Sequence, residues 1–385
     1  MIAALVALSA CAPQASRTAG GYAPQPMAGQ IAPPPPPRAK VAVLLPLTGP
    51  QAGLGQPLLN AAQLALFEQG DPSFEFLPRD TGGSPAGAAS AARTAIQDGA
   101  RVIVGPLTAQ ETAAVAGVAR GSAIPVLPFT NDANQAGTQV WPLGITPVQQ
   151  VRRLVTAGQA QGVQRFALAA PDGALGRQMA TALRAATAEL GLPQPQVEFY
   201  PAAAQPSLVA KDIAQKLSLM PDAPAEQRPG MLLLAESGVR ARDFAGALTQ
   251  SGVAMPPLRL AGHALWGMDD AMGQQLALSG AWFPGSDPAA RSQFESRYEA
   301  AFGEKPSRIV GVAYDAAAIA ARAMRGQGPN GTAQIPLGET VLGADGQLRL
   351  NPGGMVQRGL AVYAIAPGNQ PGVVAGAELP GSVGF

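Results

Sequence analysis

The stretch Val41-Ala-Val-Leu-Leu-Pro-Leu-Thr-Gly-Pro-Gln-Ala-Gly-Leu-Gly55 carries the pattern that decides the fold. Its first five residues are all apolar, which is typical of a short strand buried on both faces. Pro46 ends that strand, and from Leu54 apolar residues recur at helical spacing as far as Ala65. A buried strand, a tight turn and a one-faced helix together predict the first unit of a parallel sheet flanked by helices.

The same alternation of strand and helix continues along the chain. Further strands are expected at 74–77, 102–104, 125–127, 166–170, 197–200, 231–234 and 258–260, with later ones at 348–350 and 360–365. Helix starts are predicted at Ser84, Thr108, Thr146 and Asp287, where a capping side chain precedes proline or stands three residues before Glu or Gln. Because the chain is too long for one ordinary core, the pattern predicts an α/β fold of two doubly wound parallel-sheet lobes.

The residues before this fold predict export and a lipid anchor. The segment 1–10 is an apolar run that ends in small residues, as a signal peptide does before its cleavage site. Leu8-Ser9-Ala10-Cys11 resembles the bacterial lipobox, so Cys11 is the expected site of lipid attachment. Residues 11–39 are rich in proline and form a flexible tether that would reach about 90 Å if fully extended. We therefore expect a periplasmic lipoprotein held to the outer membrane or, as a second choice, to the inner membrane.

The residue inventory excludes several classes of function. Net charge is only +1 and charged residues make up 13% of the chain, so nothing resembles a nucleic-acid-binding surface. With one histidine and one cysteine, no His/Cys metal cluster can form. Neither a Gly-x-Ser-x-Gly elbow nor a phosphate-binding loop is present. We expect a protein that is not an enzyme, with no catalytic residue, no metal and no cofactor.

Three segments taken in order resemble a known family. Val41 to Gly55, Val102-Ile-Val-Gly-Pro-Leu-Thr108 and Ile124-Pro-Val-Leu-Pro-Phe-Thr130 are similar to the leucine/isoleucine/valine-binding, type I periplasmic binding proteins. The resemblance implies that the chain leaves its first lobe, returns and leaves again. We expect residues 40–145 in the first lobe, 146–262 in the second, 263–345 back in the first, and 346–385 in the second together with a C-terminal tail.

Further segments resemble a subfamily, the penicillin-binding-protein activator lipoproteins. Phe129-Thr-Asn-Asp132, Asn351-Pro-Gly-Gly354 and Gln357-Arg-Gly-Leu-Ala-Val362 carry this likeness. It implies a protein that regulates peptidoglycan synthesis by contacting a penicillin-binding protein, which is a peptidoglycan synthase. The alternative is the substrate-binding protein of an ABC transporter for amino acids or a related small solute, whose partner would be a permease.

Thr108 and Thr130 are candidate ligand residues because ligands of doubly wound sheets lie beyond the carboxyl ends of the strands. The family resemblance implies three further candidates, Phe129, Leu175 and Glu236. Leu175 stands where the family often has an aromatic side chain, and Glu236 could pair with a ligand ammonium. Each has a structural alternative: Thr108 with Glu111 forms a capping box, Thr130 begins a turn, and Glu236 could be a solvated loop charge.

The tryptophans and the one histidine are weaker candidates. Trp141, Trp266 and Trp282 would suit a sugar or an aromatic ligand if they faced a cleft, but most tryptophans pack in a core. His263 follows a predicted strand, where a loop or core role is more common than ligand binding.

Overall fold

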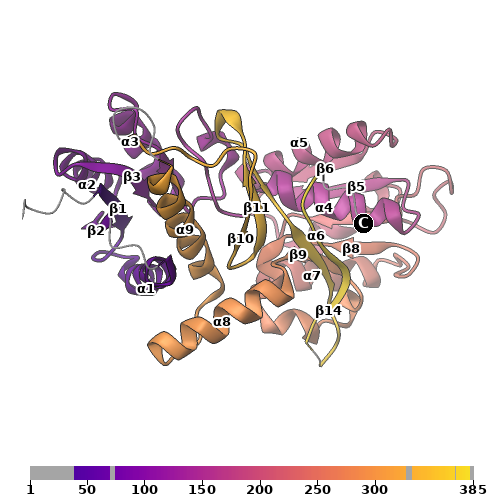
Figure 1. Ribbon diagram of the computed structural model, residues 1–385. Helices are drawn as coiled ribbons and strands as arrows, with labels where there is room; N and C mark the ends of the chain where they lie inside the picture. Colours follow the sequence, from indigo (N-terminus) through magenta and orange to yellow (C-terminus); the bar gives the residue numbers. More distant parts are fainter. Residues whose placement is uncertain (1–38, 70–73, 327–331, 369, 382–385) are drawn as a thin grey trace, which may run out of the picture. The chain divides into compact units, whose positions relative to one another are not determined.

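The computed structural model describes residues 39–69, 74–326, 332–368 and 370–381, and these residues form three sheets (Figure 1). Cys11, the expected signal peptide at 1–10 and residues 11–38 of the expected tether lie outside the described residues. None of the described helices combines the length and the apolar character needed to cross a membrane.

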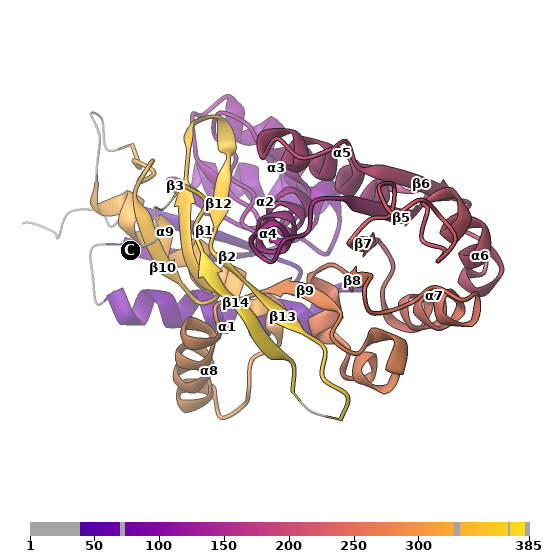
Figure 2. The ribbon, with the colours of Figure 1, turned by 90° about the vertical axis from the view of Figure 1, so that its right-hand side faces the viewer.

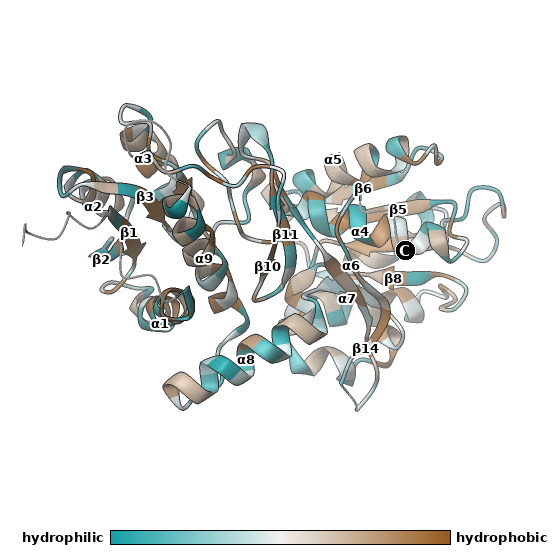
Figure 3. Cartoon of the chain, in the orientation of Figure 1, coloured by the Kyte–Doolittle hydropathy of each residue, from teal (hydrophilic) through white to brown (hydrophobic). Residues whose placement is uncertain are grey.

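The first sheet has four parallel strands in the order β2-β1-β3-β4. Their bounds are β1 Ala39–Leu45, β2 Phe74–Asp80, β3 Ala100–Val104 and β4 Val126–Leu127. Side chains alternate along β1: Val41 and Val43 share a core with α1 (Ala52–Gln69) and α9 (Gly311–Arg325), whereas Ala42 and Leu44 share one with α2 (Pro85–Gln97) and α3 (Ala109–Arg120). Because helices cover both faces, residues 41–45 of β1 and 102–104 of β3 are apolar on both sides of the sheet, and Figure 3 shows these strands largely in brown.

The second sheet has seven strands in the order β14-β13-β9-β8-β7-β5-β6 (Figure 2). Their bounds are β5 Phe166–Pro171, β6 Gln196–Tyr200, β7 Met231–Leu234, β8 Arg259–Ala261, β9 Trp282–Gly285, β13 Leu360–Ala364 and β14 Gly372–Glu378. The strands from β6 to β9 are parallel, and β13 and β14 are antiparallel to their neighbours. Helices α4 (Pro147–Ala160) and α5 (Ala174–Glu189) cover one face, and α6 (Pro206–Lys216) and α7 (Gly238–Gln250) cover the other.

A third, antiparallel sheet completes the first lobe. It consists of β10 (Thr340–Gly343), β11 (Gly346–Leu350) and β12 (Val356–Arg358). Buried side chains of β10 and β11 belong to the same core as β1 and α1, and so do those of helix α8 (Pro288–Phe302). Between β8 and β9 the chain forms three short 3-10 turns, Ala264–Met268, Asp270–Gln274 and Leu276–Leu278.

The predicted fold class is confirmed, because the parallel first sheet and the largely parallel second sheet both carry helices on both faces. Ser84, Thr108, Thr146 and Asp287 are N-caps, and each accepts a hydrogen bond from the first turn of its helix. The structure adds four strands that the sequence pattern did not predict, namely β9, β10, β12 and β14.

The crossing points differ from those expected. The chain returns to the first lobe after Gly285 rather than at 263, because β9 pairs with β8 and β13 in the second sheet. It leaves again at Gly359 rather than at 346, because β11 and β12 pair with β10. Strand pairing is a tertiary property that the local pattern does not reveal.

Buried charges join the crossing segments to one another. The Arg358 guanidinium donates two hydrogen bonds to the Leu143 carbonyl, at 3.1 and 2.8 Å, and forms an ion pair of 2.7 Å with Asp315. Burial raises the pKa of Asp315 to about 6, and Arg358 opposes that shift. Close by, Ser286 donates to the carboxylate of Asp345 at 2.7 Å. The chain therefore fixes its passages between lobes with paired polar groups.

Candidate functional site

At the carboxyl edge of the first sheet, Asp80 holds the loop between β1 and α1. Its carboxylate accepts hydrogen bonds from the backbone N–H groups of Leu47, Thr48 and Gly82 and, at 2.6 Å, from the Thr48 hydroxyl. The Thr48 and Gly82 hydrogen bonds hold the pKa of Asp80 below its usual value. Gly49 has a φ of +83°, and a Cβ there would lie 2.5 Å from the Gly82 carbonyl oxygen, so the tight turn requires glycine.

Thr108 forms the predicted capping box at the start of α3. Its hydroxyl accepts a hydrogen bond from the Glu111 N–H, and its own N–H donates to the Glu111 carboxylate at 3.0 Å. The Thr108 hydroxyl also donates to that carboxylate at 2.8 Å. The capping box therefore accounts for both the donor and the acceptor of the Thr108 hydroxyl.

Phe129 and Thr130 follow β4, and both side chains are buried. Phe129 packs in the core of the first lobe, and the Thr130 hydroxyl accepts from the Asp132 N–H at 3.1 Å. Asp132 in turn accepts a hydrogen bond of 3.2 Å from the side chain of Gln178 on α5. This contact brings the loop after β4 close to the first turns of α5, where Leu175 lies half-buried against the core of the second lobe.

The carboxyl edge of the second sheet contains a buried polar cluster around Glu236, which follows β7. The Tyr200 hydroxyl donates to its carboxylate at 2.8 Å, and the Arg240 guanidinium donates to both carboxylate oxygens at 2.7 to 3.1 Å. Glu236 is 6% exposed and Arg240 is partly exposed. Burial and the hydrogen bond to Glu236 raise the pKa of Tyr200. Glu236 is therefore a buried carboxylate with partners within the chain, and not the solvated loop charge that the sequence also allowed.

His263 lies beside this cluster at the end of β8. Burial lowers its pKa to about 4, so the imidazole is neutral at physiological pH. Its Nε2 atom is buried and has no hydrogen-bond partner among the described residues. The indole N–H of Trp266 donates to the Glu236 carbonyl at 2.7 Å, and the ring lies over Gly262, where a Cβ would come within 1.9 Å of it.

The three tryptophans are buried and do not line a cleft. The Trp141 indole N–H donates to the Asn351 carbonyl at 2.9 Å, and Trp282 lies under the Arg259 guanidinium, 4.2 Å from the ring centroid. The packing role that was the alternative for these residues is the one observed. Tyr200 and Arg240 are the functional candidates that sequence reasoning missed, although Arg240 lies four residues after Glu236, in the first turn of the helix that follows it, and this spacing was a usable signal.

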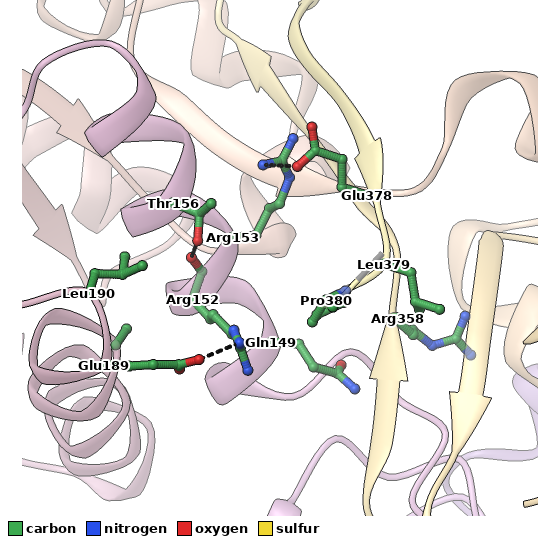
Figure 4. A pocket seen from close by; sticks show the side chains of 12 residues that line it. Gln149, Arg152, Arg153, Thr156, Glu189, Leu190, Arg358, Glu378, Leu379 and Pro380 are labelled. Atoms are coloured by element: carbon green, nitrogen blue, oxygen red, sulfur yellow. Dashed lines mark hydrogen bonds and ion pairs between the residues drawn. The ribbon is translucent and has the colours of Figure 1, made fainter. Parts of the chain in front are cut away.

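A cavity of about 220 Å³ opens between α4, α5 and the end of β14 (Figure 4). Figure 4 shows Arg152 directed at Glu189 and Arg153 directed at Glu378, and the two ion pairs measure 2.6 and 3.4 Å. None of the five sequence-predicted ligand residues lines this cavity. Within the described ranges, no group of three His, Cys, Asp or Glu side chains is arranged to hold a metal ion.

Comparisons with known proteins agree with this architecture. Residues 38–336 match the family model described as periplasmic binding protein. No curated protein matches the sequence. Among solved structures, a Rhodospirillum rubrum protein assigned to branched-chain amino acid ABC transport aligns with a TM-score of 0.75 and 19% identity, covering 88% of this chain and 100% of that one.

Two other solved structures show the range of relatives with this fold. The leucine-binding protein LivK of Thermotoga maritima has a TM-score of 0.61 and 18% identity, over 88% of this chain and 99% of that one. Full-length LpoA of Haemophilus influenzae has a TM-score of 0.66 and 18% identity, over 88% of this chain but only 59% of LpoA. At such identities these likenesses concern the fold alone, whereas the family model spans most of the sequence. The chain therefore belongs to the periplasmic binding protein family.

Proposed function

We propose that this chain is a non-catalytic lipoprotein that activates a penicillin-binding protein and so regulates peptidoglycan synthesis. Its family is one of periplasmic, ligand-binding proteins. The finer assignment rests on the segments Phe129-Thr-Asn-Asp132 and Asn351-Pro-Gly-Gly354 and on the expected lipid at Cys11. In this proposal the outer membrane holds the anchor, and the tether of residues 11–39 lets the folded part reach a synthase.

The state of Glu236 is the observation that favours a regulator over an amino-acid carrier. A carrier needs a carboxylate that is available to the ligand ammonium, but Arg240 and Tyr200 already engage both oxygens of Glu236. A ligand ammonium would have to displace Arg240 from a carboxylate that is 6% exposed. In addition, this chain has Leu175 at the position where the family often has an aromatic side chain, so the ring that would cover an aliphatic ligand is missing there.

The proposal is tested with the full chain and purified penicillin-binding proteins. The immobilised chain should retain a synthase and should raise its glycosyltransferase or transpeptidase rate. A Cys11→Ser variant is the matched control for the anchor, since it should leave the rate effect in solution unchanged and abolish attachment to the outer membrane. Failure to bind any synthase, with no change in either rate, contradicts the proposal.

The second candidate is the substrate-binding protein of an ABC transporter. It is favoured by the solved relatives from Rhodospirillum rubrum and Thermotoga maritima and by the buried Nε2 atom of His263, which has no hydrogen-bond partner among the described residues. It predicts stabilisation of about 2.7 kcal/mol at a hundredfold excess of ligand over Kd. A thermal-shift screen of amino acids and related acids measures this, and a gain that Glu236→Gln removes would select the carrier.

A further inference from the structure

A second hollow, of about 430 Å³, lies at the opposite edge of the seven-stranded sheet, where β5, β7 and β8 begin. These strands are neighbours in the order β8-β7-β5, so their amino ends meet (Figure 2). Arg165 stands immediately before β5, Arg228 lies just before β7 and Arg259 opens β8, and all three line the hollow. The hollow is remote in the fold from the carboxyl-edge residues discussed above.

Charge distinguishes this hollow from the rest of the second lobe. The residues that line it include three arginines and no carboxylate. None of these arginines forms an ion pair with any residue that the structure describes. Many isolated surface arginines lack an ion pair, but three that line one hollow, with no carboxylate among its described lining residues, create a local positive potential.

Two of the guanidinium groups are held in place by neighbouring groups. Arg259 lies over the buried ring of Trp282 at 4.2 Å and donates one hydrogen bond of 3.0 Å to the side-chain oxygen of Gln161. Arg228 donates one hydrogen bond of 2.7 Å to the Ala223 carbonyl. A guanidinium has five N–H donors, so both side chains retain donors for a ligand while their positions are fixed.

We propose that this hollow is a binding site for a phosphate-bearing anion. Guanidinium groups bind phosphate in a planar, two-point geometry, and a phosphate group carries up to about two negative charges at neutral pH. Three arginines that line one hollow therefore match a phosphate better than they match a single carboxylate. The phosphate comes either from a soluble phosphate compound or from the headgroup of an anionic lipid, and the chemistry at the site is the same.

The first measurement is calorimetric titration of the full chain with pyrophosphate at low salt, with sodium chloride at equal ionic strength as the blank. The double variant Arg165→Gln/Arg228→Gln should weaken binding at least about tenfold, because two of three charge-assisted contacts are lost. Arg93→Gln is the matched control, since Arg93 is exposed on α2 and lies outside the hollow. Both substituted arginines are exposed, so the double variant should melt at the wild-type temperature.

The second measurement is flotation with vesicles of phosphatidylglycerol or phosphatidylcholine. Retention on phosphatidylglycerol alone, lost in the double variant and competed by pyrophosphate, supports the site with a lipid headgroup as the source. Pyrophosphate binding without vesicle retention supports the site with a soluble source. Absence of pyrophosphate binding by the wild-type chain, or equal binding by the double variant, overturns the proposal.

Discussion

The two edges of the seven-stranded sheet use charged side chains in opposite ways. At the carboxyl edge the buried Glu236 is paired with Arg240 and Tyr200. At the amino edge Arg165, Arg228 and Arg259 line one hollow that no carboxylate shares. The difference shows that a position at the edge where ligands usually bind does not make a polar side chain available, because its partners within the chain decide that.

The contrast between partnered and unpartnered charges is tested most strongly at an ion pair whose two side chains are both buried. Arg358→Met should destabilise the chain by about 3–5 kcal/mol, because it leaves the Asp315 carboxylate buried without its counter-charge. Arg152→Met is the matched control, since the Arg152–Glu189 pair is half exposed and should contribute less than about 1 kcal/mol. Urea unfolding of the three proteins measures both changes, and equal losses would contradict the role of burial.

The buried histidine should make stability depend on pH. The ordinary pKa of His263 is 6.5 and its pKa in the folded chain is about 4, so between these values the unfolded state binds more protons. Stability contributed by the neutral imidazole is therefore present above pH 6.5 and is lost as pH falls to 4, by up to about 3 kcal/mol. The free energy of unfolding, measured between pH 6.5 and pH 4, should depend less steeply on pH in His263→Gln than in the wild-type chain. An unchanged slope would exclude His263 as the cause.

Most of the fold could be predicted from the sequence because its signals are local. Strand 41–45 is apolar throughout since helices cover both faces, and Ser84 and Thr146 stand directly before proline at helix starts. Strands β9 and β14 gave no such signal. Trp282-Phe-Pro-Gly285 contains proline and glycine, and most of β14 is exposed and composed of small residues.

The candidate sites depended on contacts that are distant in sequence. The capping box at Thr108 was predictable because Glu111 lies three residues away. Tyr200 at the end of β6 reaches Glu236 beyond β7 because both strands flank β5 in the sheet, and that order is a tertiary property. The arginines that line the amino-edge hollow each lie near the start of a strand, and this common position could have indicated the site before the structure was known.

Removal of an exposed charge that is held by hydrogen bonds from neutral groups should have a smaller effect. Asp80→Asn should cost about 1 kcal/mol at pH 7, since Asp80 accepts four hydrogen bonds but lies largely in solvent. The pKa of Asp80 is lowered in the folded chain, so this stability is present above pH 3.8 and is lost as pH falls below it. The two proteins should therefore converge in acid. Asp172→Asn, at an exposed ion pair, serves as the control and should change stability less.

The smallest change in stability is expected where a charge has no partner. Arg165→Gln should alter the free energy of unfolding by less than about 0.5 kcal/mol, because Arg165 is exposed and forms no ion pair with the described residues. A slight gain is compatible with the argument, since removing one of three clustered positive charges relieves repulsion at low salt. Added pyrophosphate should stabilise the wild-type chain more than this variant. A loss of several kcal/mol without ligand would instead show that Arg165 supports the fold, and the contrast between the two edges of the sheet would disappear.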